Sequence, residues 1–147
     1  MKETEPFNAL VFTTQTTLQT IDEHSHVPKN LCLEANQLGL TPTGPIQYVY
    51  TGINGDETNT FQLAIALPIQ QPGEQPDGFS YQLFPAFHCA SYIHAGSWDD
   101  FPELYDALFA QFYGCGYQNN GRIREVYLVI DSENPTNCVT EIQIGIG

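Results

Sequence analysis

The sequence contains few basic residues. Its 147 residues include only 4 lysines and arginines against 17 aspartates and glutamates, which gives a formal net charge of −13. Proteins that bind nucleic acid directly need a basic surface, and anionic membranes also attract basic segments. Direct nucleic-acid binding and membrane binding are therefore not expected. A strongly negative protein attracts cations, including cationic organic ligands and basic proteins. The alternative is an acidity that serves solubility alone.

Long hydrophobic runs are absent as well. No stretch approaches the roughly 18 consecutive apolar residues of a membrane-spanning helix, so no membrane span is expected. The opening residues 1–6 are charged and no apolar segment follows them, so no secretion signal is predicted. A reducing cytoplasm is therefore the expected location.

The residues that usually hold metals or attack substrates are sparse. None of the four cysteines shows a C-x-x-C spacing, and three of them lie in apolar contexts typical of buried structural thiols. The only closely spaced histidines are His24 and His26, in an expected loop. Neither a G-x-S-x-G motif nor a phosphate-binding loop is present. The sequence therefore predicts no metal site and no cofactor.

One segment carries the most unusual residue of the chain. Residues 121–130 (GRIREVYLVI) are rich in β-branched and aromatic side chains, which predicts a strand. Because side chains alternate along a strand, Ile123, Glu125 and Tyr127 share one face. The other face is apolar apart from Arg124 and is expected to pack on the core. A carboxylate in so apolar a strand is the first candidate for a functional residue.

This strand has a counterpart 77 positions earlier in the chain. Eight residues between positions 39 and 69 are identical to the residue 77 positions later, where average residue usage would give about two matches. The identical pairs are Gly39/Gly116, Gly44/Gly121, Ile46/Ile123, Val49/Val126, Tyr50/Tyr127, Ile53/Ile130, Ile65/Ile142 and Ile69/Ile146. The chain is therefore interpreted as a tandem duplication. Tyr48 stands where the second half has Glu125.

Each half is predicted to form a β-α-β-β unit, which makes the fold class α+β. The first half has expected strands at 9–18, 45–51 and 61–69, a helix at 27–38 and a turn at 52–59. The second half has expected strands at 84–94, 121–130 and 140–146, a turn at 131–137, and a helix that begins within 96–102 and ends near 113. The predicted buried stripe of that helix is Phe101, Leu104, Leu108 and Phe112. The whole chain, 1–147, is expected to be a single domain, with repeat one at about 7–69, a linker at 70–82 and repeat two at about 83–147.

The two units are expected to place their helices on one side of two antiparallel sheet halves. The opposite faces should then curve around a pseudo-twofold axis and form a ligand groove. On the last strand, Ile142 is expected to face the core and Glu141 to face the groove. The expected groove residues are Tyr48, Tyr50, Tyr92, Glu125, Tyr127 and Glu141.

Three segments carry a family resemblance: HAGSWDDFPELYDAL at 94–108, YGCGYQNNGRIREVYLVID at 113–131 and TEIQIGI at 140–146. They resemble the GyrI-like (gyrase-inhibitor-like) effector-binding domain, the drug-sensing half of many bacterial multidrug-responsive transcription regulators. The resemblance implies two β-α-β-β repeats around a ligand pocket. It also implies that Glu125 is the pocket glutamate that pairs with cationic lipophilic drugs, and that Tyr50 and Tyr127 are pocket aromatics. Because the sequence contains no helix-turn-helix segment, a stand-alone member is expected.

The chemistry of such a pocket follows from its residue types. A carboxylate among aromatic side chains is desolvated, so the pKa of Glu125 should be raised, and an organic cation should restore its ionised form. Tyrosine rings add cation–π attraction. For each tyrosine, core packing with a satisfied hydroxyl is the alternative, and for Glu141 the alternative is a solvated carboxylate. Trp98 is either a hydrophobic staple at the start of the second helix or a lid on the pocket.

Three functions are consistent with these features. The favoured one is a small-molecule-binding domain that senses or sequesters hydrophobic, cationic compounds. The second is a hydrolase of electrophilic small molecules, with Glu125 as general base on a water oriented by Tyr127. The third is an acidic inhibitor or modulator of DNA gyrase. Besides a small-molecule ligand, these functions allow for a protein partner, such as gyrase or a separate regulator.

Overall fold

The computed structural model describes residues 2–52, 58–131 and 133–147. Within these residues the strands are β1 (Lys2–Glu3), β2 (Phe7–Thr16), β3 (Gln47–Thr51), β4 (Phe61–Ile69), β5 (Ser80–Phe84), β6 (His88–Ala95), β7 (Asn119–Val129) and β8 (Val139–Ile146). The helices are η1 (Ile21–His24), α1 (Val27–Gln37), η2 (Trp98–Asp100), α2 (Phe101–Gly114) and η3 (Pro135–Asn137). The order β-α-β-β occurs twice, as β2-α1-β3-β4 and as β6-α2-β7-β8. The α+β fold with its two repeated units is therefore confirmed.

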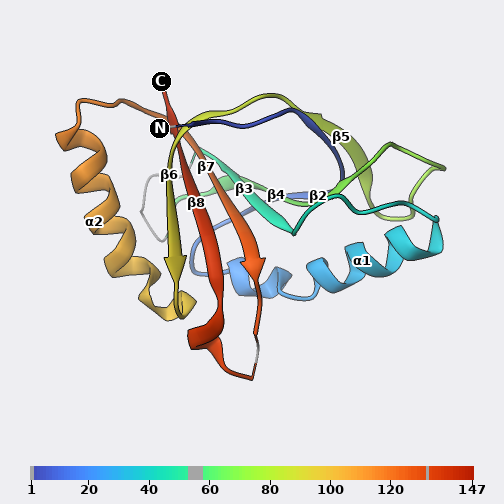
Figure 1. Ribbon diagram of the computed structural model, residues 1–147. Coiled ribbons are helices and arrows are strands. Elements are labelled where there is room, and N and C mark those ends of the chain that lie inside the picture. Colours follow the sequence, from blue (N-terminus) through green and yellow to red (C-terminus); the bar gives the residue numbers. More distant parts are fainter. Residues whose placement is uncertain (1, 53–57, 132) are drawn as a thin grey trace.

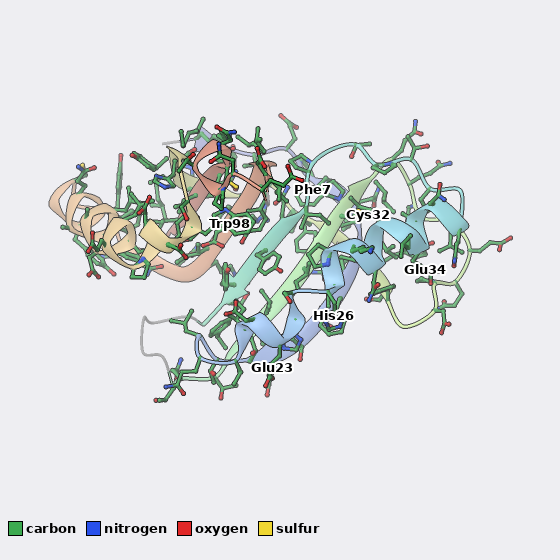
Figure 2. The ribbon with its side chains drawn as sticks, turned by 90° about the horizontal axis from the view of Figure 1, so that it is seen from below. Phe7, Glu23, His26, Cys32, Glu34 and Trp98 are labelled. Carbon is green, nitrogen blue, oxygen red and sulfur yellow. The ribbon has the colours of Figure 1, made fainter. Side chains whose placement is uncertain are left out.

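The described strands form one antiparallel sheet. Its eight strands follow the order β1-β6-β8-β7-β3-β4-β2-β5, so the two units meet where β7 of the second pairs with β3 of the first. This central pairing joins the two expected sheet halves into one sheet. Figure 1 shows the helices α1 and α2 at opposite ends of the molecule, and the view from below in Figure 2 again shows them apart. Space between the helices is therefore bounded by the sheet and by the facing sides of both helices.

The main apolar core lies on the helix-covered side of the sheet. Val27, Leu31 and Ala35 on α1 are buried against strand residues, as their helical spacing predicts. The largest cluster of buried residues also includes Leu10, Ile46, Tyr50, Phe61, Leu63, Ile65, Leu67, Ile69 and Ile123. The apolar stripe of α2 packs over Ile142 and Ile144, and only Phe112 of that helix is fully buried. The face that carries Ile123 and Glu125 is therefore the core face.

This arrangement corrects the expected position of the core. The opposite face, which begins with Arg124, carries a smaller cluster of Ala9, Val11, Val49, Ala66 and Phe84. Arg124 is itself 4% exposed, and its guanidinium lies 4.3 Å from the ring centroid of Phe87. Burial lowers the pKa of Arg124 to about 10. The prediction failed because a carboxylate was assumed to point away from the core, whereas Glu125 lies within it.

The start of the second unit also differs from the prediction. A single strand was expected over 84–94, but β5 ends at Phe84 and β6 begins at His88. Pro85 lies between them and cannot donate to a strand ladder, which ends the pairing of β5 with β2. The last residues of the expected linker therefore belong to an edge strand. The repeat limits 7–69 and 83–147 stay a prediction, and the expected turns at 52–59 and 131–137 include residues 53–57 and 132, which lie outside the described residues.

The cysteines divide into two pairs by exposure. Cys89 and Cys138 are buried free thiols, as expected, whereas Cys32 and Cys115 are exposed free thiols on or beside helices. Two thiols, and not the expected three, are therefore buried. In the described part of the chain, no helix is both long and apolar enough to cross a membrane.

Candidate functional site

Glu125 lies at the pseudo-twofold axis of the molecule. It sits on β7 directly opposite Tyr48 of β3 on one side and Ile142 of β8 on the other. Tyr48 is also the residue that the 77-residue offset makes equivalent to Glu125. When equivalent residues of two antiparallel strands face each other, the axis that relates the strands passes between them. The carboxylate is therefore near the centre of the fold, and its residue is only 4% exposed.

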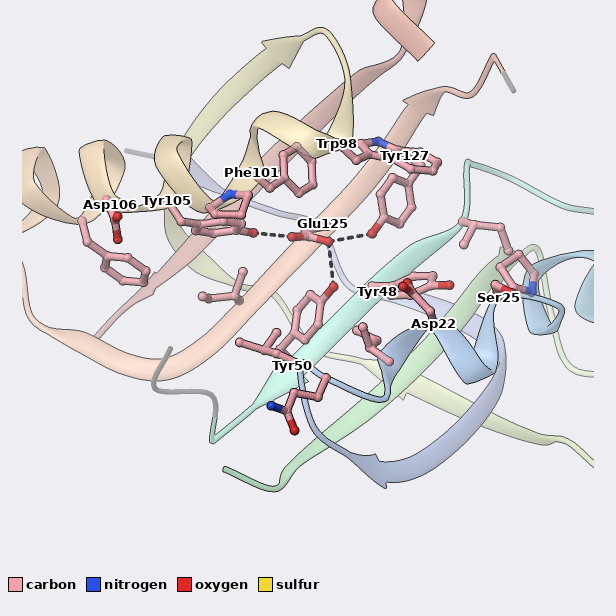
Figure 3. Close-up of a pocket in the computed structure, with 18 of the residues that line it drawn as sticks. Asp22, Ser25, Tyr48, Tyr50, Trp98, Phe101, Tyr105, Asp106, Glu125 and Tyr127 are labelled. Atoms are coloured by element: carbon pink, nitrogen blue, oxygen red, sulfur yellow. Dashed lines mark hydrogen bonds between the residues drawn. The ribbon is translucent and has the colours of Figure 1, made fainter. Parts of the chain in front are cut away.

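Three tyrosine hydroxyls donate hydrogen bonds to the Glu125 carboxylate (Figure 3). Tyr50 on β3 and Tyr127 on β7 both donate to Oε1, at 2.7 Å and 2.6 Å respectively. Tyr105 on α2 donates to Oε2. A carboxylate offers about four acceptor positions, so three donors leave roughly one position open. One helix and two strands, drawn from both units, therefore meet on this one side chain.

Burial dominates the electrostatics of the carboxylate. It raises the pKa of Glu125, while the hydrogen bonds from the Tyr105, Tyr127 and Tyr50 hydroxyls act in the opposite direction. Burial and the nearby carboxylate also raise the pKa of Tyr50, Tyr105 and Tyr127 well above the usual tyrosine value. All three hydroxyls therefore keep their protons at neutral pH and act as donors. An ionised Glu125 would have neutral hydrogen-bond donors but no positive partner.

Aromatic rings form the walls around this carboxylate. The Tyr48 ring meets the Tyr127 ring edge to face at 5.1 Å, and the Trp98 ring meets Tyr127 at 5.3 Å. The Tyr105 ring packs edge to face against Phe101 at 5.9 Å. Trp98 is held in place because its Nε1 donates to the Thr140 hydroxyl at 3.0 Å. These walls present ring faces and edges to the space above Glu125.

That space is a cavity of about 1180 Å³ between the two helices and the sheet. Its lining residues are Leu18, Gln19, Ile21, Asp22, Ser25, Pro28, Ile46, Tyr48, Tyr50, Trp98, Phe101, Pro102, Tyr105, Asp106, Phe109, Tyr113, Asn119, Ile123, Glu125, Tyr127 and Ile130. Every one of these residues is described, and they include three carboxylates but no lysine, arginine or histidine. The lining of the cavity is thus mostly apolar or aromatic, and its only ionisable charged groups are carboxylates.

The structure brings most of the expected groove residues together, but on the helix side of the sheet. Glu125, Tyr48, Tyr50 and Tyr127 all line the cavity, and so does Trp98. The groove was expected on the face away from the helices, so that placement was wrong. The physical reason is that the two helices do not meet over the middle of the sheet, so the core face itself is left open there. Trp98 lies at the cavity wall with 41% of its surface exposed, which suits a lid better than a staple.

Glu141 and Tyr92 do not line the cavity. Glu141 pairs with Val126 and therefore points to the sheet face opposite Glu125, which contradicts its expected orientation. On that face it accepts hydrogen bonds from Ser91 and Gln143 and forms an ion pair with Lys2 at 2.6 Å. Tyr92 pairs with Ile142 and so shares the Glu125 side, but it lies two strands away and is 42% exposed. The structure therefore separates both residues from the cavity.

Sequence reasoning missed three residues of the site. Tyr105 was overlooked because the buried stripe of α2 was taken to be Phe101, Leu104, Leu108 and Phe112. The same helix also carries an aromatic row at helical spacing, made of Phe101, Tyr105 and Phe109. That row was the available signal. Asp22 and Asp106 lie on η1 and α2, and nothing in their local sequence distinguishes them from solvated surface carboxylates. The described residues contain no cluster of three histidine, cysteine, aspartate or glutamate side chains placed to hold a metal ion.

Known proteins share this architecture. A comparison with curated proteins found no match. Among solved structures, the C-terminal domain of EcmrR superposes with a TM-score of 0.84 at 20% identity, covering 99% of this chain and 94% of the other. EcmrR in a complex with DNA gives a TM-score of 0.84 at 19% identity, with 99% of this chain covered. The match covers 55% of that EcmrR chain, so this chain spans about half its length.

Two further structures share the fold at lower identity. SAV2435 bound to tetraphenylphosphonium has a TM-score of 0.71 at 9% identity, covering 99% of this chain and 92% of the other. A hydrolase from Listeria innocua has a TM-score of 0.58 at 12% identity, covering 99% of this chain and 91% of the other. At these identities the likeness is evidence for the fold alone. The sequence itself matches the GyrI-like small molecule binding domain over residues 1–146, and the chain therefore belongs to this family.

Proposed function

We propose that this small-molecule-binding domain senses or sequesters hydrophobic organic cations. The observation that carries the proposal is the Glu125 carboxylate, buried in an aromatic cavity whose lining includes no basic residue. An ionised carboxylate there lacks a counter-charge within the protein. A positively charged ligand would supply this counter-charge. Its attraction to the carboxylate is strong at low dielectric, so the bound ligand would favour the ionised form of Glu125.

The hydrogen bonds around Glu125 favour one kind of cation. Tyr50, Tyr105 and Tyr127 already donate to the carboxylate and fill most of its acceptor positions. A primary ammonium would need several acceptors to replace its lost water. A delocalised cation with few or no N–H groups needs few or none, and it gains cation–π attraction from the surrounding rings. The preferred ligand is therefore a lipophilic cation whose charge is spread over an aromatic or phosphonium framework.

A relative of the same fold gives support of a weaker kind. SAV2435, whose structure contains tetraphenylphosphonium, shares the fold with this chain at 9% identity. Tetraphenylphosphonium is a permanent cation with no hydrogen-bond donor, which is the class that the geometry of Glu125 favours. We infer the same class of ligand for this chain from the geometry around Glu125, not from the sequence identity of 9%.

The test is a fluorescence titration with rhodamine 6G. Trp98 and five tyrosines line the cavity, so a bound dye should quench protein fluorescence. We expect micromolar binding by the wild type and at least about tenfold weaker binding by Glu125→Gln. Glu103→Gln, which removes an exposed carboxylate on α2 outside the cavity lining, should bind as the wild type does. Equal binding by wild type and Glu125→Gln, or no binding by either, would contradict the proposal.

A hydrolase is the second candidate, because the pKa of Glu125 is raised towards the range of a general base. A structure of a Listeria innocua hydrolase shares the fold at 12% identity. Against this function, three hydroxyls occupy the carboxylate, which leaves little room for a water that it would deprotonate. Rhodamine 6G is an ester, so mass spectrometry of the recovered dye separates the two functions. Intact dye is expected, and a Glu125-dependent acid product would favour the hydrolase.

No feature of the site favours the third alternative, an inhibitor or modulator of DNA gyrase.

A further inference from the structure

A second carboxylate lies at the edge of the same cavity. Asp22 belongs to the short helix η1 (Ile21–His24), which precedes α1, and it lines the cavity although it is exposed. Its carboxylate forms no hydrogen bond and no ion pair with any other described residue. Asp22 is therefore available to a molecule that enters the cavity from this side.

Tyr48 connects Asp22 with Glu125. Tyr48 also lines the cavity beside Glu125, but unlike Tyr50, Tyr105 and Tyr127 it does not donate its hydroxyl to the carboxylate. The Tyr48 hydroxyl forms no hydrogen bond with any other described residue. Burial raises the pKa of Tyr48 to about 12, with further contributions from Glu125 and from Asp22. Both carboxylates therefore act on one hydroxyl. Figure 3 shows Asp22 beside the Tyr48 ring on one side of Glu125, and Asp106 on the other side.

We propose that the ligand class of this cavity includes elongated dications, with one delocalised centre above Glu125 and the second centre between Asp22 and the Tyr48 hydroxyl. This inference rests on the function proposed above, because it assigns the first centre to the same carboxylate. The unpaired hydroxyl of Tyr48 can accept a contact from the second centre, and Asp22 supplies the opposite charge. Asp106 lies on α2, and nothing in the structure connects it to Tyr48 or Glu125 in this way.

Ethidium and propidium form a matched pair of probes. They share the phenanthridinium ring, and propidium adds a second, permanently charged ammonium on a short side chain. Direct titration of each dye by fluorescence anisotropy gives the ratio of the two dissociation constants. In the wild type we expect propidium to bind about fivefold more tightly than ethidium, a gain of the size that a partly exposed charge pair supplies.

The deciding variant is Asp22→Asn, and the matched control is Glu23→Gln. Both remove one negative charge from η1, both positions are exposed, and only Asp22 lines the cavity. We expect Asp22→Asn to bring the ratio close to one while ethidium binding stays near the wild-type value. Glu23→Gln should keep the wild-type ratio, because it changes the net charge by the same amount without touching the cavity.

The possible results distinguish a failure of the dication subsite at Asp22 from a failure of the cation pocket at Glu125. If ethidium binds in a Glu125-dependent way but the ratio is the same in wild type and Asp22→Asn, the dication subsite is wrong and the cation pocket stands. An equal fall of the ratio in Glu23→Gln would also overturn the subsite, since net charge alone would explain it. If neither dye binds the wild type, both proposals fail together.

Discussion

The Tyr127 hydroxyl donates a hydrogen bond of 2.6 Å to Oε1 of Glu125, two residues earlier on the same strand. Residues two apart on a strand project from the same face, so the strand itself supplies both the carboxylate and one of its donors. Tyr50 reaches the same oxygen from the neighbouring strand, and Tyr105 reaches the other oxygen from α2. The cavity is thus organised around a carboxylate whose donors are fixed by the backbone of both units.

The first prediction concerns the hydroxyl of Tyr127. Tyr127→Phe removes a donor from a buried carboxylate and should lower the free energy of unfolding by about 1–3 kcal/mol. Tyr92→Phe is the control, because Tyr92 is 42% exposed and its hydroxyl has no partner among the described residues. Urea denaturation of both variants measures the difference. Equal stabilities of the two variants would show that the hydrogen bond to Glu125 contributes nothing.

The second prediction concerns the pH dependence of stability. Burial raises the pKa of Glu125 in the folded chain above its ordinary value. The folded state therefore favours the protonated carboxyl, and this contribution is complete below the unfolded pKa of about 4.3 and is lost as the pH rises through the folded pKa. We expect the stability of the wild type to fall relative to Glu125→Gln over that interval. Urea denaturation from about pH 4 to about pH 8 measures it, and parallel curves would contradict the raised pKa.

The third prediction follows from the same ionisation and concerns binding. A permanent cation binds best when Glu125 is ionised, so its affinity should fall as the pH drops through the raised pKa of Glu125. Below that pKa the fall should approach about tenfold per pH unit. Rhodamine 6G titrations at several pH values measure the effect. Glu125→Gln should show weak binding that does not change with pH, and a wild-type affinity that is equally flat would contradict the role of the carboxylate.

The fourth prediction separates Glu141 from the cavity. Burial alone would raise the pKa of Glu141, but its contacts with Lys2, Ser91 and Gln143 outweigh burial and lower it. A carboxyl with a lowered folded pKa stabilises the protein above its unfolded pKa and loses that effect as the pH falls through the folded pKa. Glu141→Gln should therefore destabilise the protein at neutral pH by about 1–3 kcal/mol. Its stability should approach that of the wild type in acid.

Binding provides the second measurement for Glu141→Gln. Because Glu141 points to the sheet face opposite Glu125, rhodamine 6G affinity should stay within about twofold of the wild type. A large loss of dye affinity at neutral pH, without unfolding, would place Glu141 in the binding site after all.

The sequence was sufficient to predict the position of Glu125 but not the side of the sheet on which it acts. Two signals placed Tyr48, Tyr50, Glu125 and Tyr127 together. One is the alternation of side chains along each strand, and the other is the 77-residue repeat, which makes Tyr48 equivalent to Glu125 and Tyr50 equivalent to Tyr127. Glu141 pairs with Val126 in a regular stretch of the β7–β8 register, next to the pair Glu125–Ile142. Ile142 was correctly expected on the core face, so Glu141 was misplaced only because Glu125 was assigned to the face away from the core.

The helices limited the prediction in a different way. Both were expected near their observed bounds, but how far apart they lie over the sheet follows from packing between distant residues. Because the helices lie apart, the core face above Glu125 is open. The position of α2 at the side of this opening also places the Tyr105 hydroxyl on the Glu125 carboxylate. A buried carboxylate in an apolar strand was therefore assigned to a face away from the core, when it lies in an opening within the core.

The most direct test of the cation pocket compares two ions of the same shape and opposite charge. Tetraphenylphosphonium and tetraphenylborate differ in the sign of their charge and hardly at all in size or apolar surface. Isothermal titration calorimetry at neutral pH should give micromolar binding of tetraphenylphosphonium, lost in Glu125→Gln, and no measurable binding of tetraphenylborate. Comparable binding of both ions would show that the cavity recognises apolar shape alone, and the central role assigned to the Glu125 charge would be wrong.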